Sequence, residues 1–312
     1  MRCDLHVHSR HSGHDGLPGF LHGFGRECYS DPAAVAAVAR SRGMQLVTLT
    51  DHDSIEGALS LMGPADTFLS EEVTCRLPGG AVVHVGVYGI EERDHAEISA
   101  RHDDGERLFA YLAERRIPAA LNHPLSALAG ERRPQDLLLA LRGLPLVETR
   151  NGLMSRRLNH GARAAARALR RGEVGGSDAH TLASVARAFT EVEGARDREE
   201  FLDGLRLRLA IPRGASGGYA RLTADVARLL GSGYAEALTL ALGGPRELAL
   251  TAAAVALLPL LSLLPLVTAA FAIRDAAFAL QELRALRTAV GRGRPLSRPG
   301  LASAVLMPGG GP

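Results

Sequence analysis

The first residues of the chain contain a dense run of histidines, DLHVHSRHSGHDG, between Asp4 and Gly16. On a β-strand, side chains two positions apart lie on the same face. In CDLHVH, Asp4, His6 and His8 therefore share one face, and the apolar residues between them share the other. Neutral imidazole binds Zn, Mn and Fe well. The pattern predicts that His6 and His8 point together toward a metal ion, whereas His11 has the wrong parity and is expected to be a bystander.

The same alternation places further imidazoles and carboxylates at the ends of other short apolar runs. These candidate ligands are His52, Glu72, His84, His123, Asp178 and His180. Together with the HVH pair they exceed the four ligands of one tetrahedral site, which predicts two or three ions bridged by a carboxylate. Glu72 is the candidate bridge, because in FLSEEVT it has the parity of Ser70, whereas Glu71 has that of Leu69.

Short apolar runs alternate with helix-like stretches over residues 1–194, and this alternation must position the candidate ligands. Asp31-Pro32 predicts the start of one helix, and others are expected over about 94–116 and 156–171. Strands that alternate with helices are typical of a parallel α/β sheet, open or closed into a barrel. In a closed barrel the strand ends meet at one face, so a barrel is the working architecture. The predicted strands are Cys3–His8, Leu46–Asp51, Thr67–Thr74, Val82–Ile90, Ala119–His123, Leu146–Arg150 and Val174–Asp178.

Residues 195–296 are expected to form an α-helical C-terminal region that begins with a connector over 195–245. Within this region, 248–273 reads LALTAAAVALLPLLSLLPLVTAAFAI and carries no charge. Residues 297–312 are expected to be a disordered tail.

The uncharged run has two interpretations. It exceeds the ~20 residues that span a bilayer, but Pro259 and Pro265 interrupt it. Several arginines follow it, which disfavours a single span from a cytosolic enzyme domain. The alternatives are contact with the inner face of a membrane, and a buried or homo-oligomeric helix pair through 248–283.

The composition excludes some chemistries. All 36 basic residues are arginine, so a Schiff-base lysine, a lysine-dependent phosphate loop and a carbamylated lysine are excluded. The formal net charge of +2 gives no general attraction to nucleic acid, and no specific nucleic acid partner is expected. The three cysteines form no CxxC pair and no secretory leader pattern is visible, so a cytoplasmic location is expected.

The motifs DLHVHS, TDHD, SEEVT, VHV, NHP and GGSDAH occur in the order typical of the PHP (polymerase and histidinol phosphatase) family. The chain resembles this family over about residues 2–192, and is most similar to its stand-alone bacterial members. The resemblance implies a distorted seven-stranded (β/α) barrel and a metal-dependent phosphoesterase. By motif it assigns metal binding to the eight residues above, and to either His14 or Asp15, of which His14 is favoured.

The resemblance also implies a reaction. Two or three divalent ions, Mn, Fe or Zn, would generate a hydroxide at neutral pH and hold the phosphoryl oxygens during an in-line displacement. The expected substrate is a small phosphorylated metabolite or a nucleotide. A nuclease-type phosphodiesterase and a non-catalytic, membrane-associated metal-binding sensor or scaffold are the alternatives.

Four further residues are candidates for catalysis or substrate binding. Asp51 either orients a metal ligand or caps the helix that follows it. In the absence of lysine, a cation that holds the phosphate must be arginine. Arg10 is a candidate in catalysis, and Arg26 and Arg150 are candidates in substrate binding, because all three lie near predicted strand ends.

Overall fold

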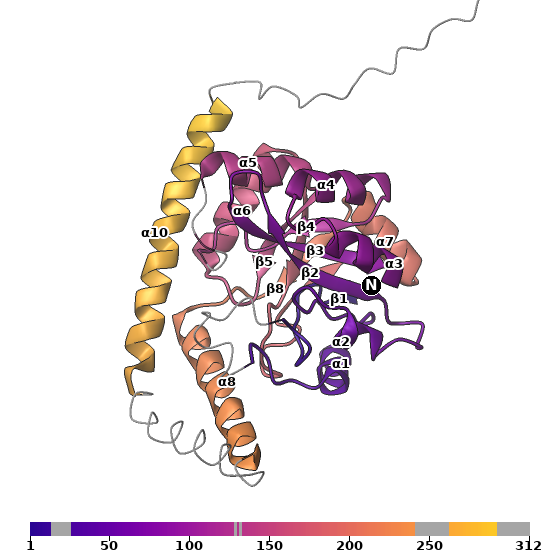
Figure 1. The fold of residues 1–312 in the computed structure, drawn as a ribbon, viewed down its shortest axis with the longest axis vertical. Coiled ribbons are helices and arrows are strands. Elements are labelled where there is room, and N and C mark those ends of the chain that lie inside the picture. The colour runs from indigo at the N-terminus through magenta and orange to yellow at the C-terminus, as the bar shows by residue number, and fades with distance from the viewer. Residues whose placement is uncertain (14–25, 128–129, 131–132, 241–261, 292–312) are drawn as a thin grey trace, which may run out of the picture.

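The structure, a computed structural model, describes residues 1–13, 26–127, 130, 133–240 and 262–291. An α/β body contains most of the described chain, and two long C-terminal helices lie along one side of it (Figure 1). His14 and Asp15, the stretch 248–261 of the uncharged run, and the expected tail 297–312 lie outside the described residues.

Two separate sheets form the body. The five-stranded sheet has the order β2-β3-β4-β5-β6, with β2 and β4 both antiparallel to β3, and β5 parallel to β4 and β6. The three-stranded sheet is antiparallel, with the order β1-β7-β8. The strands are β1 Arg2–Cys3, β2 Leu69–Arg76, β3 Val82–Ile90, β4 Ala119–Leu121, β5 Leu146–Asn151, β6 Gly172–Gly176, β7 Ala188–Glu191 and β8 Ile211–Gly214.

The predicted seven-stranded barrel is not confirmed, because the sheets do not close among the described residues. Cys3 pairs with β7, but the rest of the predicted strand Cys3–His8 and the predicted strand Leu46–Asp51 pair through isolated bridges such as Val7 to Ala179 and Cys3 to Leu46. Side chains take over part of the backbone hydrogen bonding there: Thr50 Oγ1 accepts from the N–H of Val7, and Asp4 Oδ1 accepts from that of His6. The fold is therefore a mixed α/β arrangement, neither wholly parallel nor closed.

Local signals explain where several helices begin. Asp31 caps α1 by accepting hydrogen bonds from the N–H groups of Ala33 and Ala34, as the Asp-Pro pair predicts. Asp104 caps α4, so the helix expected over 94–116 is divided into α3 and α4. The helices of the body are α1 Pro32–Ser41, α2 Glu56–Leu59, α3 Glu92–Ser99, α4 Gly105–Glu114, α5 Pro134–Gly143, α6 Arg156–Ala168 and α7 Arg198–Arg206.

The expected helical connector 195–245 is partly wrong. It contains α7, whose Phe201 and Leu205 are fully buried in the core, and then β8, which pairs with β7. The chain is therefore part of the α/β body as far as Gly214, because an edge strand and a core helix both follow residue 194. The domain boundaries at 194 and 296 stay predictions.

The C-terminal helices, α8 Tyr219–Leu240 and α10 Leu264–Gly291, pack on each other and on the body. The Tyr219 hydroxyl donates to the Pro265 carbonyl at 2.8 Å, and the hydroxyls of Thr223 and Thr268 lie 2.8 Å apart. Asp225 of α8 accepts a hydrogen bond from the Ser184 hydroxyl of the body at 2.6 Å. Polar contacts thus join α8 both to α10 and to the body.

In the part of the chain that the structure describes, one helical stretch, Leu264–Arg284, is long and apolar enough to cross a membrane. Its mean hydropathy is 1.3, and 17% of it is buried. This assignment rests on the length and composition of the helix alone. Contact with a membrane and homo-oligomer formation through 248–283 therefore stay predictions.

Candidate metal centre

Glu72, on β2, lies at the centre of a buried cluster of imidazoles and has no exposed surface. Its Oε2 atom lies 3.0 Å from His6 Nε2, 3.4 Å from His8 Nε2 and 3.3 Å from His52 Nε2. Its Oε1 atom lies 3.2 Å from His123 Nε2 and 3.5 Å from His84 Nδ1. One carboxylate therefore faces all five of these rings, with an oxygen toward each side of the cluster.

Asp178 is the second carboxylate of the cluster. Its Oδ1 atom lies 3.5 Å from His6 Nε2, 3.6 Å from His8 Nε2 and 3.7 Å from His180 Nδ1. Its other oxygen accepts a hydrogen bond from the Asn151 side chain at 3.0 Å, which fixes the carboxylate orientation. Glu72 and Asp178 thus flank the HVH pair.

The donor atoms form four overlapping groups of three, in which all the ligand atoms lie within 4.8 Å of one another. His6, His8, Glu72 and Asp178 each belong to two groups. The groups are His6-His123-Asp178, His6-His8-Glu72, His8-Asp178-His180 and His52-Glu72-His84.

The residues present fit divalent ions. Among the described residues, the buried ring nitrogens His8 Nε2 and His84 Nδ1 have no hydrogen-bond partner, and a buried polar atom without a partner is costly unless a ligand occupies it. The mixed imidazole and carboxylate donors suit Zn, Mn or Fe. The eight described residues of the predicted ligand set all lie in this one cluster.

Charge coupling inside the cluster is strong. Burial by itself lowers the pKa of His6, but Glu72, Asp178 and Glu148 together raise it well above its usual value. Burial likewise opposes protonation of His52, yet Glu72 and Glu27 raise its pKa to about 10. In the metal-free protein, protonated histidines therefore neutralise the carboxylates. Bound divalent cations would take over this role.

Glu148, within β5, lies against the HVH pair. Its Oε1 atom lies 2.9 Å from His6 Nδ1 and accepts a hydrogen bond there, and its Oε2 atom accepts from the His123 backbone N–H at 2.9 Å. This arrangement leaves His6 Nε2 to face the cluster. Glu148 is not among the residues predicted from the sequence, and the available signal was its place in the short strand LVETRN.

Asp51 does not cap the following helix, and its contacts lie next to the metal-ligand candidate His8. Its two oxygens accept hydrogen bonds from the N–H and the hydroxyl of Ser9, at 2.5 and 2.8 Å, and the residue at the N-cap of α2 is Ile55. Burial raises the pKa of Asp51 to about 6. Asp51 therefore fixes the chain immediately after His8, which is a positioning role.

None of the three candidate arginines is among the described residues that line the pocket over the cluster. Arg10 pairs with Asp31 at 2.9 Å, and Arg26 pairs with Glu236 at 3.5 Å. Arg150 donates to the Ser216 hydroxyl at 3.2 Å. Each guanidinium has a polar partner in the structure, and the roles of the three residues in catalysis and substrate binding stay predictions.

Glu27 is a site residue that the sequence analysis missed. Its Oε1 atom lies 3.1 Å from His180 Nε2 and 3.5 Å from His52 Nε2. Burial opposes its ionisation, but His52 and His180 hold its pKa well below the usual value. It is the only acidic residue between Gly16 and Ser30, which was the available signal. His11, by contrast, faces Glu56 at 3.2 Å, away from the cluster.

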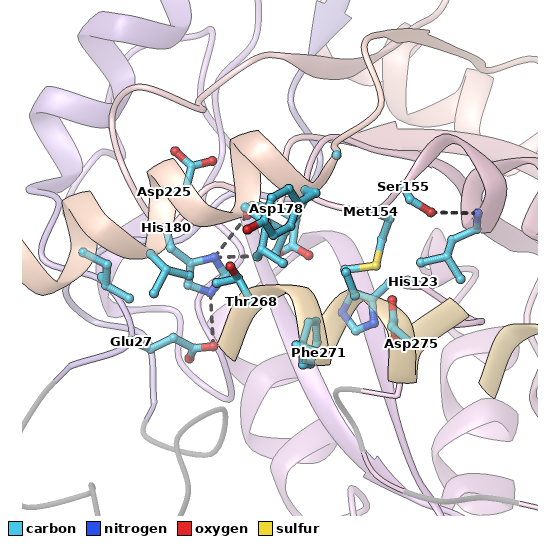
Figure 2. A pocket seen from close by; sticks show the side chains of 18 of the residues that line it. Glu27, His123, Met154, Ser155, Asp178, His180, Asp225, Thr268, Phe271 and Asp275 are labelled. Atoms are coloured by element: carbon cyan, nitrogen blue, oxygen red, sulfur yellow. Dashed lines mark hydrogen bonds and ion pairs between the residues drawn. The ribbon is translucent and has the colours of Figure 1, made fainter. Parts of the chain in front are cut away.

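A pocket of about 560 Å³ lies over the cluster. Its floor consists of Glu27, His52, His84, His123, Asp178 and His180. The helices α8 and α10 contribute to its walls, and Figure 2 shows Thr268, Phe271 and Asp275 of α10 on the side that faces His123 and His180. The metal donors therefore face a space large enough for a small molecule.

One family model and two solved structures are similar to parts of this chain. Residues 156–208 match the PHP_C family model, described as PHP-associated. This match supports the resemblance to the PHP family that the histidine and aspartate motifs indicate. No curated protein matches the chain.

Two solved structures are similar to the chain. PsfC from Pseudomonas syringae PB-5123 is 19% identical, with a TM-score of 0.49, and the similarity covers 74% of this chain and 95% of PsfC. A "putative metal-dependent phosphoesterase" from Bifidobacterium adolescentis ATCC 15703 is 12% identical, with a TM-score of 0.43, and the similarity covers 69% of this chain and 96% of that protein.

Proposed function

We propose that this protein is a metal-dependent phosphoesterase that uses two or three divalent ions, Mn, Fe or Zn, to hydrolyse a small phosphorylated substrate. One observation carries the proposal: the four donor groups overlap through Glu72 and Asp178 beneath a pocket. Ions that share a carboxylate lie close enough together to act on one phosphoryl group.

The donor set favours ions that accept nitrogen and oxygen ligands. Cys28 is the cysteine nearest the cluster, and its thiol donates to the backbone carbonyls of His8 and His180. Burial raises its pKa to about 11, so it stays a neutral thiol near pH 7. Cys28 therefore supports two ligand-bearing segments and is not a ligand itself.

Bound ions would supply Lewis-acid polarisation of the phosphoryl oxygens and activation of water. The chain's own residues provide the orientation. Glu148 and Asp51 fix the segment that carries His6 and His8, and Asn122 donates to Glu72 Oε1 at 2.9 Å. Met154 and Phe271 line the pocket and exclude bulk water from one side of the reacting ester.

The test combines metal content with hydrolysis. We expect the purified protein to carry more than one equivalent of Mn, Fe or Zn by elemental analysis, and to release phosphate from an aryl phosphate monoester. Replacement of His6 and His8 together by Ala should abolish both properties. The matched control is His160→Ala, which removes an exposed histidine of α6.

Two results would contradict the proposal: protein without bound metal after reconstitution, or full activity in the double variant. A diester assayed beside the monoester distinguishes a phosphatase from the nuclease-type alternative. Metal content without hydrolysis of either ester would favour the non-catalytic alternative.

A further inference from the structure

The pocket over the cluster has a polar floor and apolar walls. The walls of α8 and α10 include Leu222, Val226, Leu229 and Phe271, and Met154 and Leu158 line the side of the body. Above the metal donors, a substrate group therefore meets mainly hydrocarbon.

The charges at the pocket oppose a highly polar substrate. None of the described residues that line it is an arginine, although every basic residue of the chain is an arginine. Four acidic residues line it, Glu27 and Asp178 in the floor and Asp225 and Asp275 in the helical walls. The further phosphates of a nucleotide would need cationic partners there, and carboxylates repel additional anionic groups.

The apolar surface continues beyond the pocket onto α10. Val267 lines the pocket and is also largely exposed. On the same helix, Leu266 and Ile273 are 69% and 70% exposed, and neither lines the pocket. Leu266 and Ile273 therefore place exposed apolar side chains on α10 outside the pocket.

From these observations we propose that the substrate is a phosphate ester of an apolar alcohol, whose hydrocarbon group lies between α8 and α10. This inference rests on the proposed phosphoesterase function and specifies its substrate class. The phosphate faces the polar floor, and the hydrocarbon occupies the apolar part of the pocket. A volume of about 560 Å³ accommodates a ligand of ordinary small-molecule size.

The first experiment varies only the alcohol. Ethyl, butyl, octyl and dodecyl phosphate are supplied below their micelle concentrations to the metal-loaded protein, and phosphate release is measured. Burial of a methylene contributes at most about fourfold. We expect kcat/KM to rise by at least a hundredfold from ethyl to octyl phosphate. Equal rates, or faster hydrolysis of ethyl phosphate, would overturn the inference.

A matched pair of variants locates the effect on α10. Phe271→Asp places a charge in the wall, whereas Ile273→Asp places the same charge two residues away on the exposed side. We expect Phe271→Asp to lower the octyl-to-ethyl ratio at least tenfold, and Ile273→Asp to leave this ratio unchanged. An equal effect of both variants would overturn the assignment of the wall. The chain-length series of the unmodified protein does not depend on the folding of either variant.

A second arm distinguishes a soluble ester from one held in a membrane. A long-chain lipid phosphate in phosphatidylcholine vesicles is compared with monomeric octyl phosphate. Faster hydrolysis of the vesicle substrate that is lost in Ile273→Asp supports the inference and indicates that the ester comes from a membrane. Faster hydrolysis of the monomer supports it with a soluble source.

The outcomes separate the two proposals. A protein inert toward every ester, including the aryl phosphate, contradicts the phosphoesterase function. If the protein hydrolyses ethyl phosphate and kcat/KM does not rise with chain length, only the inference of an apolar alcohol is contradicted. Calorimetry with ethyl- and octylphosphonate, which lack the cleavable ester bond, tests the pocket without turnover. Octylphosphonate that binds no more tightly than ethylphosphonate would overturn the inference.

Discussion

Asp275, on α10, accepts hydrogen bonds from the Ser126 hydroxyl at 3.1 Å and from the Ala127 N–H at 2.7 Å. These two donors follow His123 by three and four residues. The carboxylate thus joins the C-terminal helix to the loop that carries a metal donor, and burial raises its pKa.

Asp275→Ala should loosen both partners, because it removes the oxygen that accepts from the Ser126 hydroxyl and from the buried Ala127 N–H, at about 1–3 kcal/mol for the Ala127 N–H. We expect faster amide hydrogen exchange in α10 and in residues 124–127, with little change in β2 and β3. Asp275→Asn is the control, since its carbonyl oxygen can still accept. Unchanged exchange in the Ala variant would show that α10 is held by other contacts.

Glu148→Gln should weaken metal binding about 10- to 100-fold, as is usual when the partner of a ligating imidazole is lost. The amide can donate to His6 Nδ1 and thereby favour the wrong tautomer. The measurement is competition with a chromophoric chelator. Glu173→Gln, on the neighbouring strand β6, removes a carboxylate that faces Arg163 and Arg167, and should leave the affinity unchanged.

Glu27→Gln tests the carboxylate supplied by the loop. Since Glu27 faces both His180 and His52, its loss should lower the metal content of the protein or the affinity of one ion. Elemental analysis after dialysis measures this. Glu56→Gln removes the exposed partner of His11 and serves as the control. Identical metal content in the Glu27 variant and the parent would exclude Glu27 from the site.

Metal binding should release protons. In the metal-free protein the pKa of His6 is well above its usual value and that of His52 is about 10, so both are protonated at neutral pH, whereas burial and His180 lower the pKa of His8 to about 4. Ions must displace the protons of His6 and His52, so metal affinity should increase from pH 6 to pH 8. Calorimetry in two buffers of different ionisation enthalpy measures the release, and a value of zero at neutral pH would contradict the prediction.

The same coupling gives a stability effect of known sign. A histidine whose pKa is raised by folding contributes stability that is fully present below its unfolded pKa. For His52 this contribution, measured in metal-free protein, should fall as pH rises from about 6.5 toward 10. Thermal unfolding at several pH values, with and without metal, tests it. Metal-free protein with a midpoint that increases over this range would contradict the assignment.

Strand parity could be predicted from the sequence because it is a local geometric property. It places Glu72 among the imidazoles, whereas Glu71 points the other way and faces His95 at 2.8 Å. Glu27 could not be found in this way, because a glycine-rich loop has no periodicity. The closed barrel was expected from the alternation of elements. Alternation does not reveal that the side chains of Asp4 and Thr50 accept backbone hydrogen bonds that a neighbouring strand would otherwise accept.

The packing partners of the C-terminal helices could not be predicted from the sequence. Hydropathy identifies an apolar stretch but does not identify its neighbour, so Phe271 could equally have faced lipid, a second copy or its own chain. In the structure it lines the pocket. Arginine placement is similarly unpredictable, because a partner such as Asp31 or Glu236 is brought near only by folding.

Part of the pocket wall comes from a later part of the chain than the floor. The described metal donors lie between His6 and His180, whereas α8 and α10 begin only at Tyr219. Mutations of wall residues such as Leu222, Val226 and Phe271 therefore change no metal donor. New substrate preferences can therefore arise through changes in α8 and α10 while the metal donors stay the same.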